Sequence, residues 1–259
     1  MPIHPTAIIS PEASIDDSVE VGAYAIVEGN ARISAGCKIA PQAQILSGVE
    51  LAENVSVGRA AVIGEDPQDH SFDSSLESGV KIGTETLIRE HVTIHRSNQE
   101  GGFTKVGARN FLMVGSHLGH DVEMGDDNVL ANAVLVAGHC IIGSHIFMGG
   151  GSVYHQFVRV GDYAMIQGNA SISADIPPFT VASQLNQLFG LNVVGIRRAG
   201  FSKEVRSGLK SAYDHMFRSG KNRRQALAEV EGEEKGERGQ FFKFFREESK
   251  KGICSPPAK

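Results

Sequence analysis

Cysteine is scarce in this sequence of 259 residues, which contains only Cys37, Cys140 and Cys254. Their number is odd and their spacing follows no pattern, so we expect free thiols rather than a disulfide framework. Cys37 also occupies a position of the repeat described below that requires a small residue, which favours a buried structural thiol. The cysteine content therefore predicts a protein of a reducing compartment.

Features that would indicate several other classes of protein are also missing. No apolar run approaches the roughly 20 residues that a membrane-spanning helix needs, and no charged leader with an apolar signal segment precedes the repeat. The net charge of −5 argues against nucleic acid as a partner. The sequence lacks the G-x-S-x-G, P-loop and H-E-x-x-H motifs. We expect a soluble, cytoplasmic protein without a membrane span.

What the sequence does contain is an aliphatic residue at every sixth position. Two breaks, after Ile63 and after Ile94, interrupt the series. The series comprises Ile3, Ile9, Ile15, Val21, Val27, Ile33, Ile39, Ile45, Leu51, Val57, Ile63, Ile82, Ile88, Ile94, Val106, Leu112, Leu118, Met124, Leu130, Val136, Ile142, Met148, Tyr154, Val160, Ile166 and Ile172. A small residue often follows four positions later, as at Ala25, Ala31 and Cys37. A period of six predicts an all-β solenoid of hexapeptide repeats, whose short strands each point one aliphatic side chain inward.

Three hexads make one coil, so equivalent residues recur every eighteen positions, as Gly107, Gly125, Gly143 and Gly161 do. We expect the solenoid to cover residues 1–178, with loops near 66–81 and 97–105 where the period breaks. Two prolines after Asp175-Ile176 end it, because proline cannot continue a strand ladder. Long loops in compact domains are often functional.

The remainder of the chain has a different pattern. A connecting segment is expected over 179–200, followed by a helical domain over 201–259. Apolar residues at helical spacing predict helices from Ser202 to Gly220, over 222–231 and over 238–250. This domain would cap the last coil. Basic residues on its helices are candidates for meeting an acidic partner, namely Arg223, Arg224, Lys243 and Arg246.

The candidate chemistry lies in a column of histidines. In the eighteen-residue register, position 120 is equivalent to 138 and 156, so His120, the pair Gly138-His139 and the pair His155-Gln156 should stack on one edge of the solenoid. His117 lies three residues before His120. Imidazoles gathered on one edge are hard to explain by packing.

The residues alone leave more than one function open. Three neutral imidazoles are a common zinc ligand set, which a trimer of solenoids could assemble between subunits as gamma-class carbonic anhydrases do. Alternatively, His120 could act as a general base beside Asp121, with the Gly138 N–H facing a developing oxyanion, an arrangement that suits acyl transfer. A third hypothesis is a trimeric scaffold without catalytic activity. Arg197 and Arg198 have guanidinium groups suited to diphosphate oxygens.

Several segments together resemble one family of hexapeptide-repeat enzymes. They are IREHVTIHR (88–96), SHLGHD (116–121), LVAGHC (135–140), YHQF (154–157), DIPPF (175–179) and RRAGFS (197–202). The combination resembles the acyl-carrier-protein–UDP-N-acetylglucosamine O-acyltransferases (the LpxA family), which carry out the first committed step of lipid A synthesis. The resemblance runs along the whole chain.

The resemblance implies a left-handed parallel β-helix with a C-terminal helical domain, active as a homotrimer with clefts between subunits. It makes His120 the general base, oriented by Asp121, and places the Gly138 amide in the oxyanion hole. It implies no metal and no cofactor, because the acyl donor is the phosphopantetheine thioester of acyl carrier protein. The residues it assigns to substrate binding are Gln68, Asp69, His117, His139, His155, Gln156, Asn192 and Arg198, with Gly168 where the family measures acyl-chain length.

The sequence departs from the usual family pattern at three places near the substrate. No lysine follows Gln68-Asp69, the segment 183–188 is a residue shorter and lacks a histidine, and Ala199 replaces a second arginine. We expect transfer of an R-3-hydroxyacyl chain, without a covalent acyl-enzyme, to position 3 of UDP-N-acetylglucosamine. Relatives with similar departures accept the 3-amino analogue of the sugar, which is the alternative acceptor here.

Overall fold

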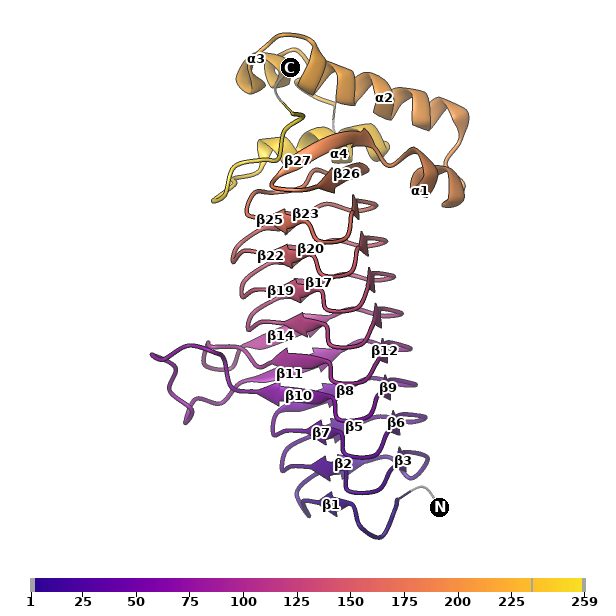
Figure 1. The fold of residues 1–259 in the computed structure, drawn as a ribbon, viewed down its shortest axis with the longest axis vertical. Helices are drawn as coiled ribbons and strands as arrows, with labels where there is room; N and C mark the ends of the chain where they lie inside the picture. Colours follow the sequence, from indigo (N-terminus) through magenta and orange to yellow (C-terminus); the bar gives the residue numbers. More distant parts are fainter. Residues whose placement is uncertain (1–2, 234, 258–259) are drawn as a thin grey trace.

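The computed structural model describes residues 3–233 and 235–257 as a triangular β-solenoid with helices over one end (Figure 1). In this part of the chain, short strands form three sheets of nine, eight and ten strands, which are the three faces of a prism. All pairs are parallel except β26 with β27. Each turn of the chain visits the first, second and third face in that order.

The strands of each face follow one another at one-coil intervals. The first face contains β1 (Ile8–Ile9), β4 (Ile26–Val27), β7 (Gln44–Ile45), β10 (Val62–Glu65), β13 (Thr93–His95), β16 (His117–Leu118), β19 (Leu135–Val136), β22 (Val153–Tyr154) and β25 (Ser171–Ile172). The second contains β2 (Ser14–Ile15), β5 (Arg32–Ile33), β8 (Val49–Leu51), β11 (Gly79–Ile82), β14 (Phe103–Val106), β17 (Glu123–Met124), β20 (Ile141–Ile142) and β23 (Arg159–Val160). The third contains β3 (Glu20–Val21), β6 (Lys38–Ile39), β9 (Ser56–Val57), β12 (Leu87–Ile88), β15 (Phe111–Leu112), β18 (Val129–Leu130), β21 (Phe147–Met148), β24 (Met165–Ile166), β26 (Thr180–Ser183) and β27 (Gln187–Leu191).

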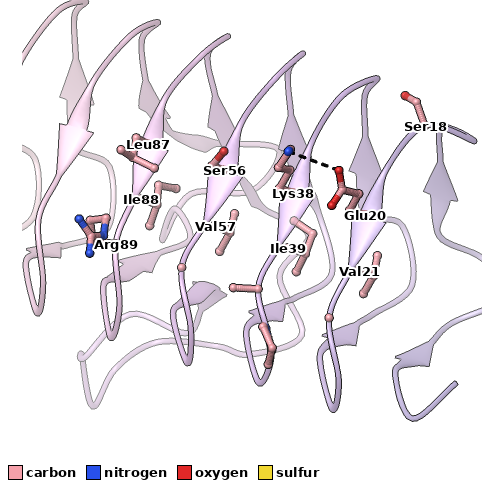
Figure 2. Close-up of a pocket in the computed structure, with 14 residues that line it drawn as sticks. Ser18, Glu20, Val21, Lys38, Ile39, Ser56, Val57, Leu87, Ile88 and Arg89 are labelled. Atoms are coloured by element: carbon pink, nitrogen blue, oxygen red, sulfur yellow. Dashed lines mark ion pairs between the residues drawn. The ribbon is translucent and has the colours of Figure 1, made fainter. Parts of the chain in front are cut away.

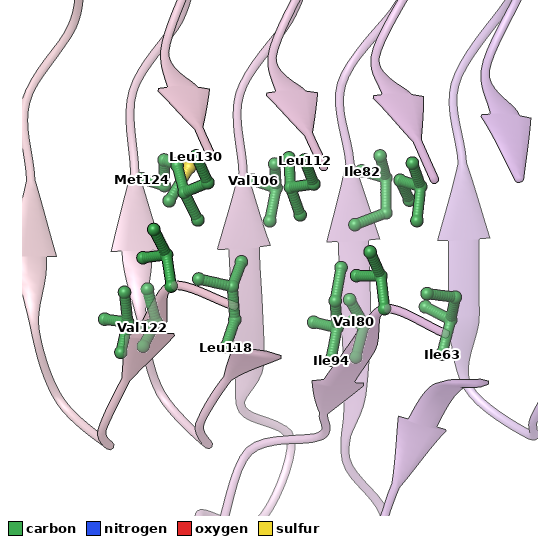
Figure 3. Packing of buried hydrophobic residues seen from close by; sticks show 14 of the residues in the cluster. Ile63, Val80, Ile82, Ile94, Val106, Leu112, Leu118, Val122, Met124 and Leu130 are labelled. Atoms are coloured by element: carbon green, nitrogen blue, oxygen red, sulfur yellow. The ribbon is translucent and has the colours of Figure 1, made fainter. Parts of the chain in front are cut away.

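The six-residue period corresponds to the interior of the prism. In each two-residue strand the second side chain points inward, and from Val21 to Ile172 these anchors are buried. Figure 3 shows them interdigitating, for example Ile94, Leu112 and Leu118. The register between neighbouring coils is eighteen residues, as in Leu118 opposite Val136. Burial of one aliphatic side chain in every strand therefore holds the solenoid together.

The two breaks in the period are loops that leave the prism. Segment 66–78 joins β10 to β11, and segment 96–102 joins β13 to β14, so both are slightly shorter than predicted. The inward register resumes behind each, with Ile63 opposite Ile94 and Ile82 opposite Val106, and only a bulge between Ile63 and Glu65 marks the start of the first loop. Figure 1 shows these excursions projecting together beside β10 and β11.

The segment predicted as a connection, 179–200, is more ordered than a connection. It forms the antiparallel pair β26 and β27, which continues the third face, and the helix α1 (Val193–Arg198). Phe179 begins a second hydrophobic core with Ile196 and the helices that follow. This part thus belongs to the end of the solenoid, and the reason is that β26 pairs with β24 and covers its open edge.

The helical domain comprises α2 (Lys203–Arg218), α3 (Arg223–Ala228) and α4 (Gly236–Arg246), close to the three ranges predicted. Side-chain oxygens of Ser202 and Asn222 cap the first two. After α4 the chain turns back: Ile253 pairs with Asp175, and Ser255 with Gln187. The helices and this returning tail cover the last coil (Figure 1).

Two expectations about the whole chain can be compared with the structure. Cys37, Cys140 and Cys254 are buried free thiols, and burial raises the pKa of Cys140 to about 12. Among residues 3–233 and 235–257, no helix combines the length and apolar character that crossing a bilayer requires.

Candidate active site

The histidine column and both loops lie on one edge of the prism, where the first face turns into the second. Segment 66–78, segment 96–102 and the corner that carries His120 and Asp121 occupy this edge on successive coils. The next two coils bring the Gly138-His139 corner and the corner from His155 to Phe157 onto the same edge. The N–H of His139 donates to the His120 carbonyl at 2.9 Å, which confirms the predicted stacking.

His120 and Asp121 form a directly hydrogen-bonded pair. The Nδ1 atom of His120 lies 2.8 Å from Oδ2 of Asp121, and since an ionised carboxylate only accepts, Nδ1 carries the proton. In the neutral ring the other nitrogen, Nε2, is then unprotonated and able to accept a proton. The pair lies at the left-handed corner of its coil, with Asp121 at φ 59°.

Glycine at position 138 leaves space in front of that nitrogen. A Cβ atom added to Gly138 would lie 2.6 Å from Nε2 of His120. A Cβ on Gly119 would lie 2.7 Å from the Gly138 nitrogen. Among the hydrogen bonds of the described residues, none uses the Gly138 N–H as a donor. Two glycines thus keep a proton acceptor and an N–H donor accessible on one corner.

Residues of the second loop also bind Asp121, and the six-residue repeat of the sequence did not predict these contacts. Its Oδ1 accepts a hydrogen bond from the Ser97 hydroxyl, and its Oδ2 accepts one from the Asn98 N–H at 3.1 Å. The Asp121 N–H donates to Oγ1 of Thr104 at 2.8 Å. Burial opposes ionisation of Asp121, but the hydrogen bonds from His120, Ser97 and Asn98 outweigh it and lower the pKa of the carboxyl.

His139 and the C-terminal tail complete this edge. The His139 ring meets the His120 ring edge-on at 4.8 Å and stacks on Phe157 at 4.7 Å. The Nζ atom of Lys250 lies 4.7 Å from the Phe157 ring centre, and Nζ of Lys251 lies 3.1 Å from Nδ1 of His155. Burial, above all, lowers the pKa of His139. His155 and Gln156 are exposed beside the tail.

His117 lies on the flank of the first face rather than at the corner. Its Nδ1 is 2.8 Å from the Thr93 hydroxyl, and its ring meets the buried His95 ring edge-on at 4.8 Å. Burial, aided by His95, lowers the pKa of His117 to about 4. His117 is therefore neutral at physiological pH.

Arg96 fixes the first loop, segment 66–78. Its guanidinium donates to Asp66 at 2.7 Å and to the carbonyls of Leu76 and Ser74 at 2.6 and 2.8 Å. Gln68 and Asp69 are exposed at the start of this loop. Hydrogen bonds from Ser71 lower the pKa of Asp69, and the charge of His120 contributes. Asp69, one of the two predicted sugar-nucleotide residues, thus lies near enough to His120 to interact with the charged form of that ring.

Three predicted substrate residues lie elsewhere on the chain. Gly168 is at the corner between the third and first faces, and Asn192 and Arg198 belong to the segment around α1. Asn192 and Arg198 line a cavity of about 590 Å³ with Phe147, Leu191 and Val194. The Asn192 amide caps α1 through Gly195 and donates to the Tyr163 carbonyl, which gives it a structural function. One chain does not bring these residues to the His120 edge.

A larger hollow of about 790 Å³ lies on the third face of the lower coils (Figure 2). Outward side chains such as Glu20, Lys38 and Leu87 line it. It contains none of the predicted site residues. The hollow is therefore separate from the edge that carries His120 and Asp121.

A metal could be considered at this edge because ligand atoms of His120, Asp121 and His139 lie within 4.8 Å of one another. However, the Asp121 oxygens already accept hydrogen bonds from Ser97, Asn98 and His120. The proton on Nδ1 of His120 also faces the carboxylate. This arrangement favours acid–base chemistry over metal binding.

Sequence reasoning did not find Ser97, Asn98, Phe157, Lys250 or Lys251. Ser97 and Asn98 begin a loop that interrupts the register, so their coil position could not be extrapolated. Phe157 was a neighbour of the predicted pair and could have been found from its position, eighteen residues after His139. The lysines reach the edge only because the tail turns back along the last coil.

A solenoid of six-residue repeats that carries a His–Asp pair beside an available backbone amide defines a hexapeptide-repeat acyltransferase. Residues 175–254 match the family model described as "Udp N-acetylglucosamine O-acyltransferase; Domain 2". The acyl-[acyl-carrier-protein]–UDP-N-acetylglucosamine O-acyltransferase of Syntrophobacter fumaroxidans is 39% identical over 89% of this chain and 90% of its own length. The enzyme of that name from Thermodesulfovibrio yellowstonii is 40% identical over 97% of this chain and 98% of its own length.

Solved structures agree with this relationship. LpxA from Acinetobacter baumannii is 38% identical and superposes with a TM-score of 0.92, covering 97% of this chain and 99% of that one. UDP-N-acetylglucosamine O-acyltransferase from Moraxella catarrhalis is 39% identical with a TM-score of 0.93, covering 98% and 100%. The chain belongs to the family of acyl-[acyl-carrier-protein]–UDP-N-acetylglucosamine O-acyltransferases. The predicted fold, a left-handed parallel β-helix with a helical C-terminal part, is confirmed, as is the prediction of an acyltransferase.

Proposed function

We propose that this protein transfers an R-3-hydroxyacyl chain from the thioester of acyl carrier protein to the 3-hydroxyl of UDP-N-acetylglucosamine, the first step of lipid A biosynthesis. The observation that carries the proposal is the His120–Asp121 pair, whose unprotonated Nε2 faces the Gly138 corner. The family relationship supplies the substrate class.

The geometry supports a direct transfer. Nε2 of His120 takes the proton of the sugar 3-hydroxyl while its oxygen attacks the thioester carbonyl. The Gly138 N–H donates a hydrogen bond to the oxyanion of the tetrahedral intermediate. Collapse breaks the carbon–sulfur bond, and the departing thiolate takes the proton from His120. The products are the 3-O-acyl sugar nucleotide and free carrier thiol, and the reaction requires no metal or other cofactor.

Substrate contacts follow from where the remaining residues lie. Gln68 and Asp69 on the first loop would hold the sugar nucleotide, while His117, His139, His155 and Gln156 would line the cleft. The neutral state of His117 suits a hydrogen bond to an uncharged group of the substrate. Exposed Arg223 and Arg224 remain candidates for docking the acidic carrier protein, whereas Arg246 is occupied by the carbonyls of Val230 and Glu233.

A homotrimer would explain why some predicted site residues lie far from His120 within a single chain. Gly168, Asn192 and Arg198 lie on another edge than His120, and a neighbouring subunit could place its copies beside the His120 edge. Exposed apolar side chains on the first and third faces, Leu135, Phe147 and Val153 among them, support such an association. We propose that this assembly works in the cytoplasm, where carrier protein and sugar nucleotide would be available.

The test is a transfer assay read by mass spectrometry, with R-3-hydroxyacyl carrier proteins of several lengths. UDP-N-acetylglucosamine and its 3-amino analogue are offered in competition, with and without chelator. We expect an ester product that survives chelation. His120→Ala should lower kcat by about 10²–10⁴-fold, because the general base is lost. His91→Asn, at an exposed histidine on another edge, is the control.

Each contrary outcome has a definite meaning. A His120→Ala variant that keeps more than about a tenth of the wild-type rate removes the base assignment. An amide product would retain the mechanism and change the acceptor. Loss of transfer with chelator, or no transfer to either acceptor, would instead favour the hypothesis of a trimeric zinc enzyme.

A further inference from the structure

The loop that follows β13 reaches Asp121 with its first two residues. Ser97 is fully buried, and its hydroxyl donates to Oδ1 of Asp121 while accepting from the Gln99 N–H at 3.0 Å. The Asn98 N–H donates to Oδ2. Both bonds span more than twenty residues of sequence, because the loop folds over the next coil.

Asp121 has two imidazoles within reach, and the loop determines which one it serves. Oδ2 lies 2.8 Å from Nδ1 of His120 but 4.0 Å from Nδ1 of His139. A carboxylate attached by a single rotatable bond could turn between them. The Ser97 hydroxyl occupies the opposite oxygen and so fixes the carboxylate plane in the orientation that faces His120.

The surroundings of Ser97 leave room for this hydroxyl and little more. A Cβ atom on Gly102, at the far end of the loop, would overlap Oγ of Ser97. The Ser97 carbonyl accepts from the Ser78 hydroxyl at 2.6 Å, which ties this loop to the first one. The hydroxyl itself is held between the Asp121 carboxylate, to which it donates, and the Gln99 N–H, from which it accepts.

We propose that Ser97 is a positioning residue of the transfer reaction, whose hydroxyl fixes Asp121 so that the carboxylate orients His120 with Nε2 free. The inference rests on the proposed function, since it assumes that His120 is the base. It assigns a function to the start of the second loop, where Ser97 and Asn98 bind Asp121, while Thr104 on β14 accepts from the Asp121 N–H.

The test compares Ser97→Ala with Ser78→Ala in the full-length protein. Ser78 lies where the two loops meet and donates a half-buried hydrogen bond to the Ser97 carbonyl, and among the described residues no hydrogen bond joins it to Asp121. Ser97→Ala should lower kcat by about ten- to a hundredfold, the effect of losing a hydrogen bond to a charged group, while the KM of each substrate changes less than about twofold. Ser78→Ala should change kcat by less than about threefold.

The pH profile separates positioning from general loss of structure. Asp121 faces His120 and His139, and the charged groups that line the same hollow are Glu123, Arg159, Glu248 and Lys250. The acid limb of kcat/KM reports protonation of the base, so a change in how Asp121 faces His120 should move this limb in Ser97→Ala and not in Ser78→Ala. An unmoved acid limb, or equal losses of kcat in the two variants, would overturn the proposal.

A measurement without substrate keeps this inference distinct from the proposed function. The ¹⁵N shifts of the His120 ring report which nitrogen carries the proton. We expect the Nδ1-protonated form in the wild type and in Ser78→Ala, and a mixture of tautomers in Ser97→Ala. The same single tautomer in all three proteins would refute the positioning function, whichever acceptor the enzyme uses.

Discussion

Histidines of this protein differ in chemistry because their surroundings differ. His120 has a carboxylate partner and an accessible ring nitrogen, whereas His95 and His117 pack on one another inside the first face. Burial lowers the pKa of both, since desolvation disfavours the charged imidazole. His95 and His117 thus form a ring pair in which the charged imidazole is disfavoured, while His120 at the neighbouring corner keeps a carboxylate partner.

The low pKa of His117 predicts a loss of stability in acid. The unfolded residue takes up a proton as pH falls below its ordinary value of 6.5, while the folded one does so only near 4. The unfolded state therefore binds more protons in this window, and stability falls as pH decreases from 6.5 to 4, by up to about 3 kcal/mol. Urea unfolding of His117→Asn should show a weaker pH dependence than the wild type. His91→Asn should keep the wild-type slope, and identical slopes in all three would contradict the assignment.

Among individual residues, the sequence predicted the positions of those that follow the eighteen-residue repeat and missed those that lie in an inserted loop. His120, Gly138 and His139 could be placed together because eighteen residues make one coil. Ser97 could not, because an inserted loop of variable path precedes Asp121. Contacts that depend on how a loop folds are determined by the packed structure rather than by periodicity.

Among the elements, Arg159 on β23 connects the solenoid to its helical cap. Its guanidinium donates to the fully buried Asp175 at 2.8 Å, to Glu247 at 2.9 Å and to the Phe244 carbonyl at 3.2 Å. The same group lies over the Phe244 ring at 4.4 Å. The Arg159 side chain thus joins the last coil to the end of α4. It also binds Asp175, the residue that pairs with Ile253 of the returning C-terminal tail.

Replacing Arg159 by Met should therefore destabilise the cap. Asp175 would remain buried without its cation, which typically costs about 3–5 kcal/mol. We expect a lower urea midpoint and faster proteolysis after α4. Arg109→Met is the matched control, because Arg109 pairs with Asp126 and Asp127 on the surface and such pairs contribute about 0–1 kcal/mol. Similar midpoints for the two variants would show that Arg159 does not hold the cap.

Strands and helices could be predicted where their apolar residues recur at a regular spacing. Coils and helices have a repeating apolar pattern, so their positions were predicted to within a few residues. The pair β26 and β27 has no such signal, since its strands differ in direction and one of them contains a bulge. The returning tail likewise pairs with Asp175 and Gln187 by isolated bridges, which no local pattern indicates.

The whole molecule presents faces of different character. Outward residues of the second face are mostly charged, as in the pair Lys105 and Glu123, whereas the third face exposes Leu87 and Phe147. Charged faces suit solvent, and apolar faces suit a second subunit. The molecule is therefore expected to associate through its apolar faces.

Phe147→Arg should disrupt the proposed trimer. Phe147 is 41% exposed on the third face, and an arginine there would have to be desolvated in the interface. Light scattering after gel filtration should show trimer for the wild type and smaller species for the variant. Ser14→Arg, on the second face of the first coils, should remain trimeric. A trimeric Phe147→Arg protein, or a monomeric wild type, would remove this face from the interface.

The eighteen-residue coil also limits how this chain can change length during evolution. Inserting or deleting one residue inside a coil would turn inward side chains outward, because strand register sets which face is buried. Tolerated changes are therefore whole coils, or excursions at a corner that leave the register intact on both sides, as segments 66–78 and 96–102 do. The edge that carries His120 already holds both excursions, so related chains can acquire new loops there beside an unchanged His120–Asp121 pair.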